Sequence, residues 1–463
     1  MNIDAAKQAL SHLEIDDNPV SVRAKSRDFF WYSPVLKARL DHVTADFVVA
    51  PRTEAEVIKV LAACHAHDVP VTVRGAGTGN YGQAMPLAGG CVLHMKNMAA
   101  VRSIHPGRVV VEPGCLLKDL DTACKAACGQ ELRMFSSTWA TATIGGFIAG
   151  GSGGVGSCTW GALRDLGNII RLRVVTMEAA PRVLEFRGEE LHRVSHAYGT
   201  NGIITEVEMP LAPAYDWVEL FVTCDGFADA VALAHDLGNE DGILKKLVTV
   251  FEAPIAQDYF QRVAPHLAPG QQLLALMVAP HAMDGFQTFL ARRNATIIYR
   301  SDETRWPREP GPVYEYGWNH TTLRALKVDP AITYLQVRYA GPDLLDKIAA
   351  VRAALSPEVL QHLEVMQEGG KTIMAGLSLV TFTTEARLDE IVQLHEAMGC
   401  MIFNPHRYTL EEGGRQSVDA RQLAFKREAD PKGLLNPGKM IAWDDPDFGY
   451  DRIYSYPRLQ RAS

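Results

Sequence analysis

Apolar positions follow two different periods along the first half of the chain, and together they predict strands alternating with helices. Thr53 and Glu56 have the spacing of a capping box at a helix start. One face of the helix that follows is formed by Val57, Val60, Leu61 and Cys64. A second helix is predicted over 116–128. Short apolar runs bounded by turn residues predict strands at 69–73, 91–95, 109–112, 169–176 and 203–209, the last closed by Pro210 and Pro213.

The pattern changes near residue 215. Strands are predicted at 217–224, 272–279, 331–339, 377–382 and 400–403, with helices over 227–237 and 387–398. This mixture predicts a separate α+β unit with an antiparallel sheet. Alternation in 331–339 places Tyr334, Gln336 and Arg338 on one face, which is either solvated or the wall of a pocket. Residues 425–440 are rich in turn residues and are expected to form neither strand nor helix.

Residues 144–156 read I-G-G-F-I-A-G-G-S-G-G-V-G and form the most unusual segment of the chain. Glycine in an ordered element costs about 0.5–1 kcal/mol relative to alanine. Such a run is therefore expected where a ligand approaches the backbone or where φ is positive. Flexible linkers do not carry Ile, Phe and Val between flanking tryptophans. We interpret the segment as a ligand-binding loop.

A second glycine-rich loop, residues 74–83, follows a predicted strand and contains G-x-G-x-x-G. A Rossmann site would need this loop to open a helix. Here Pro86 and the pair Gly89 and Gly90 prevent a helix, so the motif favours a phosphate-binding loop of another type, with Arg74 as a counter-charge. The two loops together predict a dinucleotide with a large flat redox ring, for which a flavin is the natural candidate.

Composition narrows the class of protein. The chain has 463 residues, 47% of them hydrophobic and 22% charged, as in ordinary globular proteins. A net charge of −8 without a run of basic residues argues against nucleic acid as a partner. No apolar stretch is long enough for a membrane span, and no signal peptide is recognisable. Eight cysteines without C-x-x-C pairs indicate reduced thiols, so a cytoplasmic location is expected.

The motifs resemble those of FAD-binding oxidoreductases of the vanillyl-alcohol-oxidase/p-cresol-methylhydroxylase (PCMH) type, closest to the D-2-hydroxy-acid and glycolate dehydrogenase branch. The matching segments are 73–82, 111–114, 144–146 with the residues before them, 199–206 and 430–440. The resemblance implies an α+β fold: a two-subdomain PCMH-type FAD-binding domain over 1–213, a cap with an antiparallel sheet over 214–400, and a C-terminal segment, 401–463, that returns to the FAD site and brings Asn436 and Lys439 near cofactor or substrate.

The resemblance also implies which residues contact FAD. The 74–82 loop is expected on the pyrophosphate and 143–157 along the isoalloxazine and ribityl side. The attachment is expected to be noncovalent, because the positions that carry a linking His or Cys in covalent relatives are Gly, Ala, Thr, Asn and Tyr here, and Cys158 lies beyond them. The predicted cofactor-binding residues are Arg74, Gly75, Ala76, Gly77, Thr78, Gly79, Asn80, Gln83, Pro113, Gly114, Thr138, Thr141, Ala142, Thr143, Gly145, Gly146, Gly150, Ser152, Gly154, Ser157, Gly202, Ile203, Ile204 and Asn436.

The substrate is less clearly indicated, because the branch's H-x-H and G-E-H-G metal motifs are missing and no metal is predicted. Residues 403–414 read F-N-P-H-R-Y-T-L-E-E-G-G instead. Oxidation of an alcohol needs a base, and His406 and His320 are the candidates. The other candidates are Arg338 and Arg407, with Arg324, as carboxylate anchors, and Tyr334, with Tyr314, Tyr316 and Tyr408, as phenol-binding groups.

Three functions remain open from the residues. The first is a dehydrogenase or oxidase that moves a hydride from a small hydroxy acid or other alcohol to noncovalent FAD. The second is an oxidase or dehydrogenase of phenolic alcohols. The third is a flavin-bearing subunit of a larger dehydrogenase complex. The expected partners are a small-molecule substrate and an electron acceptor of open identity, and a homodimer is left open.

Overall fold

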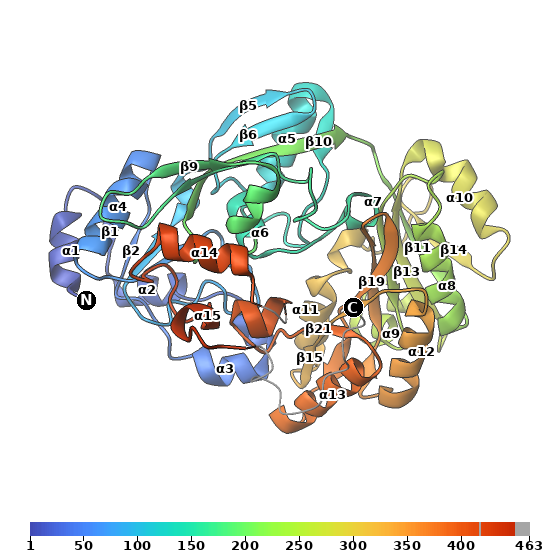
Figure 1. The fold of residues 1–463 in the computed structure, drawn as a ribbon. Helices are drawn as coiled ribbons and strands as arrows, with labels where there is room; N and C mark the ends of the chain where they lie inside the picture. Colours follow the sequence, from blue (N-terminus) through green and yellow to red (C-terminus); the bar gives the residue numbers. More distant parts are fainter. Residues whose placement is uncertain (416–417, 450–463) are drawn as a thin grey trace. The chain divides into compact units, whose positions relative to one another are not determined.

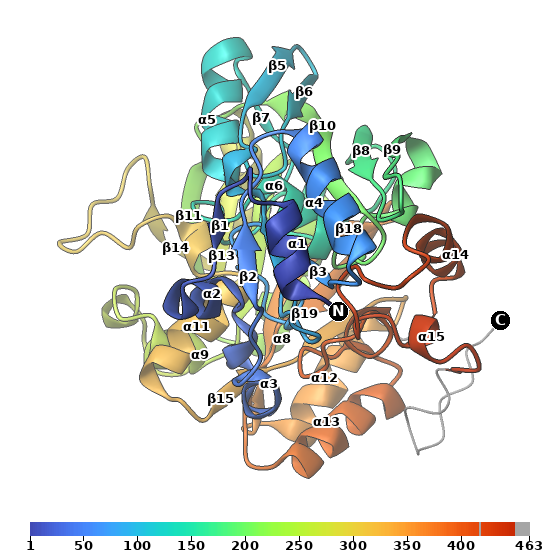
Figure 2. The same cartoon turned by 90° about the vertical axis from the view of Figure 1, so that its left-hand side faces the viewer.

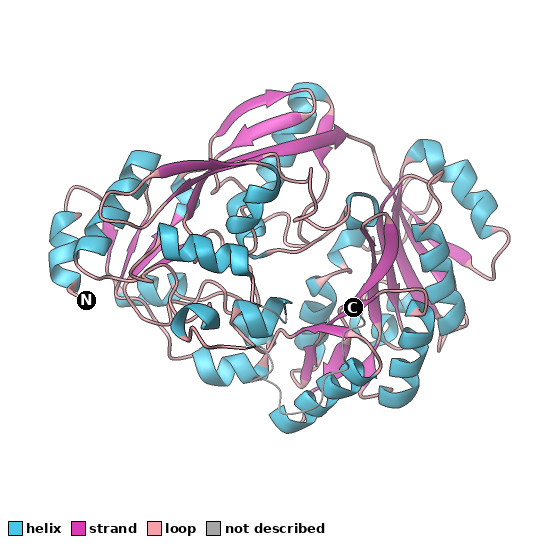
Figure 3. Cartoon of the chain, viewed as in Figure 1, coloured by secondary structure: helices cyan, strands magenta, loops and turns pink. Residues whose placement is uncertain are grey.

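The computed structural model describes residues 1–415 and 418–449, which form two compact units (Figure 1). Unit 1 contains residues 1–152 and 163–214 and, from the described later part of the chain, 405–415 and 418–449. Unit 2 contains Gly153–Ala162 and Tyr215–Asn404. The boundary at residue 152 falls inside the glycine-rich run. Helices and strands are mixed in both units (Figure 3), as expected for the predicted α+β class.

Unit 1 begins with a four-stranded sheet of order β1-β2-β4-β3. Strands β2, β3 and β4 are parallel, and β1 is antiparallel to β2. The strands are β1 (Ile15–Asp16), β2 (Phe47–Val49), β3 (Val71–Arg74) and β4 (Cys91–His94). Helices α1 (Ile3–Ala9) and α4 (Glu54–Ala66) share one hydrophobic core with this sheet (Figure 2). Between β3 and β4 the chain forms no helix, so the rejection of a Rossmann site is confirmed.

The second sheet of unit 1 has the order β5-β6-β10-β8-β9, with β7 also paired to β10. Its strands are β5 (Val101–His105), β6 (Arg108–Val111), β7 (Gln130–Leu132), β8 (Arg171–Val175), β9 (Val183–Phe186) and β10 (Ile203–Pro213). We expected Pro210 to end the last strand, and this is wrong. The pairing of β10 with β8 stops at Glu208, and its pairing with β7 begins at Leu211. Pro210 lies between these two paired segments, so neither pairing needs the N–H that proline lacks.

The remaining helices of unit 1 are α2 (Pro19–Lys25), α3 (Pro34–Leu40), α5 (Leu117–Cys128), α6 (Ile144–Gly150), α14 (Ala420–Ala429) and α15 (Ile441–Asp444). Two of them correct the expectations. Part of the supposed ligand loop is helix α6, whose first turn is capped by Thr143. Part of the supposed turn region 425–440 lies in α14. The N-cap of this helix is Asp419, whose carboxylate accepts a hydrogen bond from Gln422 N at 3.0 Å.

Unit 2 is built on an eight-stranded antiparallel sheet, which confirms the predicted sheet type. In spatial order its strands are β14 (Thr296–Arg300), β11 (Val218–Cys224), β13 (Gln272–Val278), β12 (Lys245–Phe251), β18 (His362–Glu368), β19 (Lys371–Gly376), β16 (Gln336–Tyr339) and β21 (Met401–Phe403). The helices are α7 (Ser157–Trp160), α8 (Phe227–Gly238), α9 (Ile255–Tyr259), α10 (Met283–Leu290), α11 (Asn319–Val328), α12 (Leu344–Leu355) and α13 (Glu385–Ala397).

The predicted strand 331–339 is two strands in two sheets. β15 (Ile332–Tyr334) belongs to a three-stranded sheet with β20 (Leu379–Thr381) and β17 (Val359–Leu360), whereas β16 joins the large sheet. The change of partner occurs at Leu335, whose N–H donates to Ser378 O at 3.0 Å. The predicted common face is therefore wrong: Tyr334 is fully buried, while Gln336 and Arg338 are half-buried in the other sheet.

Candidate functional site

The loop after β3 in unit 1 offers a row of unused hydrogen-bond donors. Within the described residues, the backbone N–H groups of 75–80 donate no hydrogen bond. Arg74 lies beneath the loop and is 8% exposed. Its Nη2 donates to Ala76 O at 3.1 Å and its Nη1 to Arg27 O, whereas its Nε is buried without an acceptor in the described chain. Successive backbone N–H groups without an acceptor, beside a guanidinium, fit an anion such as a pyrophosphate.

Glycine is required where this loop passes over Arg74. Gly77 has φ of +71°, a conformation that L side chains rarely adopt, and a Cβ there would lie 2.2 Å from Arg74 Nη2. Phe29 N donates to Gly79 O at 2.7 Å from the segment after α2. The N-terminal part of unit 1 thus holds the loop through the carbonyl of Gly79, and the backbone N–H groups of 75–80 remain available to a ligand.

The loop packs directly against α6, so the structure brings the predicted cofactor segments of unit 1 together. Gln83 Nε2 donates to Gly150 O at 3.0 Å, at the end of the helix. At the helix start, a Cβ on Gly75 would lie 2.1 Å from Thr143 Oγ1, the atom that accepts a hydrogen bond from Gly146 N. Both ends of α6 therefore face the 74–83 loop.

Two of the predicted cofactor glycines are explained by packing against protein backbone. A Cβ on Gly145 would lie 2.5 Å from Pro113 Cβ, and Gly145 N donates to Pro113 O at 2.9 Å. A Cβ on Gly114 would lie 2.0 Å from Met95 O. Gly145 lets α6 approach the Pro113 turn closely, and Gly114 lets the same turn approach the Met95 carbonyl, a structural reason that the sequence does not reveal.

Residues 196–204 close the other end of α6. His196 N and Tyr198 N donate to Ile148 O and Ala149 O, both at 2.9 Å, and so satisfy carbonyls of its last turn. Gly202, with φ of +121°, leads into Ile203 and Ile204 at the start of β10. These predicted cofactor residues border the same region of unit 1.

Asn436 joins these segments to the C-terminal part of the chain. Its Nδ2 donates to Gln83 O at 2.8 Å and to Tyr198 O at 2.7 Å, and its backbone N donates to Val71 O at 2.8 Å. The return of the C-terminal segment to the glycine loops is thus present in unit 1. Asn436 has its amide hydrogens engaged by protein carbonyls, which makes it a positioning group for the loops.

The other predicted cofactor residues divide between the units. Thr138, Thr141 and Ala142 form a turn before α6, where the last two N–H groups donate to Thr138 O. Ser152 Oγ lies 3.1 Å from His196 Nδ1 in unit 1. Gly154 and Ser157 lie in unit 2, where Gly154 N donates to Ser157 Oγ at 3.0 Å.

His320 lies at the start of α11 in unit 2. Its Nδ1 is 3.0 Å from Glu315 Oε2, and this contact is the largest cause that lowers the pKa of the Glu315 carboxyl. Trp318, the residue immediately before α11, has φ of +50°, a strained value for a bulky residue. Trp318 N donates to buried Glu364 at 2.5 Å, and this carboxylate also accepts from Thr249 Oγ1 at 2.6 Å. Sequence reasoning missed Glu315 and Glu364, because no local motif marks them.

His406 and Arg407 lie in unit 1, so the two candidate bases belong to different units. His406 is 1% exposed, and its Nδ1 lies 2.7 Å from Ser33 Oγ. Ser33 Oγ also accepts a hydrogen bond from Leu36 N at the start of α3. His406 therefore contacts the residue that caps α3 and helps to stabilise the start of this helix.

The arginines proposed as carboxylate anchors in unit 2 already have partners. Arg338 forms a two-point ion pair with Glu368 through Nε and Nη2. Arg324 Nε donates to Glu315 O at 2.9 Å, and its guanidinium lies 4.0 Å over the Tyr316 ring. An anchoring role for Arg338 would require a substrate carboxylate to displace Glu368.

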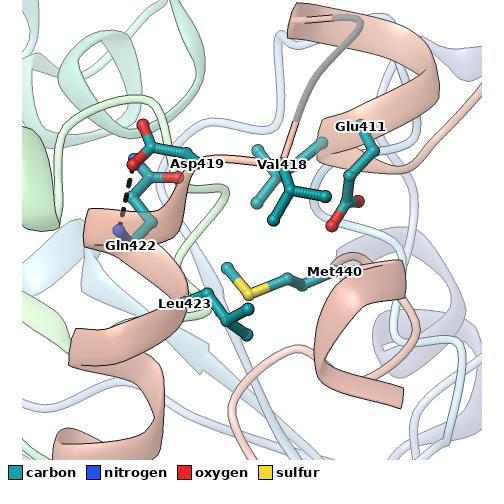
Figure 4. A pocket seen from close by; sticks show the side chains of 7 residues that line it. Glu411, Val418, Asp419, Gln422, Leu423 and Met440 are labelled. Atoms are coloured by element: carbon teal, nitrogen blue, oxygen red, sulfur yellow. Dashed lines mark hydrogen bonds between the residues drawn. The ribbon is translucent and has the colours of Figure 1, made fainter. Parts of the chain in front are cut away.

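A small pocket that opens to solvent lies elsewhere in unit 1 (Figure 4). It is lined by Leu410, Glu411, Val418, Asp419, Gln422, Leu423 and Met440, none of which is a predicted site residue. In the parts of the chain that the structure covers, no three His, Cys, Asp or Glu side chains are grouped so that they could hold a metal ion. Nor does any helix there have the length and apolar content needed to span a bilayer.

Comparisons with known proteins agree with the residues of unit 1. Residues 45–183 match the family model described as FAD binding domain. The glycolate oxidase subunit GlcD of Bacillus subtilis is 32% identical over 86% of this chain and 89% of its own length. The D-lactate dehydrogenase of Archaeoglobus fulgidus is 31% identical over 85% of this chain and 91% of its own.

A solved structure of alkyldihydroxyacetonephosphate synthase shares the fold, with a TM-score of 0.70 at 15% identity over 95% of this chain and 86% of that one. The match confirms the predicted α+β architecture. The N–H groups of residues 75–80, which donate no hydrogen bond within the described chain, and the buried guanidinium of Arg74 fit an FAD pyrophosphate. The chain belongs to the PCMH-type family of FAD-linked oxidoreductases that includes the glycolate oxidase subunit GlcD.

Proposed function

We propose that this enzyme oxidises a small hydroxy acid or another small alcohol by hydride transfer to noncovalent FAD. The anion-binding loop after β3 carries the cofactor part of the proposal, since its donors match a pyrophosphate. The names of its relatives, a glycolate oxidase subunit and D-lactate and D-2-hydroxyglutarate dehydrogenases, support the substrate class. When bound, FAD supplies the hydride acceptor.

The paired His320 and Glu315 support His320 as the base. A carboxylate 3.0 Å from Nδ1 favours a proton on that nitrogen, and Nε2 would then accept the proton of the substrate hydroxyl. The side chain of His320 is 12% exposed and therefore not sealed in the core. His406, next to Arg407, is the second candidate, but its contact with Ser33 favours a structural role.

The noncovalent attachment predicts that acid denaturation releases the flavin. Precipitation with trichloroacetic acid is expected to leave a yellow supernatant and a colourless pellet. Cys158 supports this expectation, because it is buried in unit 2, where burial raises the pKa of its thiol to about 12 and keeps it unreactive. A pellet that stayed yellow would contradict noncovalent binding.

The substrate class is tested by anaerobic titration of the purified holoenzyme. We expect a D-2-hydroxy acid to bleach the flavin absorbance in a panel that also contains 4-alkylphenols and simple alcohols. Bleaching by phenols alone would establish the phenolic alternative. Because one relative is named as a subunit, a third outcome matters: a flavin bleached by no compound until a co-purifying protein is added would identify a complex component.

A further inference from the structure

Three charged side chains are buried beneath the glycine loop of unit 1. Asp28 comes from the segment after α2, Arg74 from the end of β3, and Lys439 from the C-terminal part of the chain; all three are at least nine-tenths buried. Sequence reasoning noted Arg74 and Lys439 and missed Asp28. The cluster places two basic groups and one acidic group next to the proposed pyrophosphate site.

Lys439 is held by the loop itself. Its Nζ is fully buried and donates to Gly82 O at 2.6 Å, which is its only hydrogen-bond acceptor within the described chain. The ring of Tyr408 covers it, with Nζ 4.9 Å from the ring centre. Two of the three ammonium hydrogens thus have no acceptor. Burial of this kind disfavours the charged form and lowers the pKa of Lys439 well below that of an exposed lysine.

The neighbouring groups offset this effect only in part. Asp28 accepts from Phe30 N at 3.0 Å and from Ala84 N at 3.1 Å, and burial raises the pKa of its carboxyl. Its negative charge favours protonated Lys439 but is shared with Arg74, which also faces it. His94 is the register partner of Arg74 on β4; burial lowers the pKa of His94 to about 4, so His94 is neutral near pH 7.

We propose that binding of FAD to the 74–83 loop is coupled to the uptake of one proton by Lys439. The pyrophosphate brings negative charge to the free N–H groups of 75–80, in the loop whose Gly82 carbonyl binds Nζ. A nearby negative charge favours the ammonium form. The amine of Lys439 therefore takes a proton from the solvent when FAD binds. In the FAD-bound protein, Asp28, Arg74 and Lys439 are then all charged.

The test is calorimetric titration of the apoprotein with FAD at one pH in buffers of different ionisation enthalpy. The slope of the observed heat against buffer enthalpy gives the number of protons taken up. For the wild type we expect a value that approaches about one proton near pH 8, between the lowered pKa of Lys439 and the ordinary lysine value of about 10.4. The matched control is Lys432→Gln, which changes an exposed lysine paired with Asp68; its uptake is expected to equal that of the wild type.

Lys439→Arg separates charge from titration, since a guanidinium stays protonated throughout this range. Uptake near zero in Lys439→Arg, with FAD still bound, is the expected result. Asp28→Asn gives a second measurement: without the carboxylate the amine is neutral over a wider range, so uptake should extend to lower pH. Wild-type uptake near zero at every pH, or undiminished uptake in Lys439→Arg, would overturn the proposal. Both outcomes are measured without substrate and so do not depend on the proposed oxidation.

Discussion

Replacing His320 by alanine is expected to slow substrate-driven reduction of the flavin by about 10²–10⁴-fold, the usual contribution of a general base. The alcohol proton has no acceptor when the imidazole is removed, and the Glu315 carboxylate loses its partner at 3.0 Å. FAD content should stay unchanged, because His320 makes none of the contacts that hold the proposed pyrophosphate loop. Stopped-flow absorbance under anaerobic conditions measures the rate directly.

Two further variants make the result specific. His281→Ala changes an exposed histidine of the same unit and should reduce at the wild-type rate. Glu315→Gln keeps the imidazole but removes the carboxylate that orients it, and an intermediate loss is expected. If His320→Ala reduces normally and His406→Ala does not, the base is His406; if both reduce normally, neither histidine is the base.

Replacing Asp430 by asparagine is expected to lower the free energy of unfolding by about 3–5 kcal/mol, as when one partner of a buried ion pair is removed. Asp430 and Lys426 are both essentially inaccessible. The carboxylate binds Lys426 Nζ and accepts from Leu434 N at 3.0 Å and Leu435 N at 2.7 Å. An amide in its place presents hydrogens to some of these donors and leaves the ammonium without a counter-charge.

The effect should extend to the cofactor loops, because Lys426 Nζ also donates to Thr200 O and Leu435 O, both at 2.9 Å. Asp68→Asn is a matched control: Asp68 pairs with exposed Lys432, and its φ of +54° suits asparagine equally well. Thermal unfolding followed by circular dichroism should show a large drop for Asp430→Asn and little change for the control. Equal melting temperatures for Asp430→Asn and the wild type would refute the role of the ion pair.

The sequence was sufficient to predict the glycine loop after β3 and the antiparallel strands of unit 2, because both have local signals. The run from Arg74 to Gly82 follows a short apolar strand, and Pro86 excludes a following helix. The antiparallel strands of unit 2 have strong apolar periodicity. Such features are decided by neighbours in the chain.

The parts of the fold and of the site that the sequence did not predict depend on contacts between residues that are distant in sequence. No local sequence signal predicts that Tyr334 and Gln336 lie in different sheets. Tyr334 belongs to β15, which pairs with β20, whereas Gln336 belongs to β16, which pairs with β19 and β21. The glycines at 145 and 150 pointed to a ligand, but they also permit a helix to pack against Pro113 and Gln83. Asp28 and Glu364 lie in no recognisable motif, and only tertiary contacts reveal them.

The position of Lys439 bears on how the protein is made. Gly82 and Lys439 are 357 residues apart, and Asn436 is 353 residues from Gln83. During synthesis the ribosome therefore produces the glycine loop long before Asn436 and Lys439, and the contacts between them form only after these residues have been added. Contacts of such separation form late in folding. We therefore expect FAD to bind after synthesis of the chain is complete, and we expect a chain that ends before Asp430 to contain the 74–83 loop without Asn436 and Lys439, which contact it.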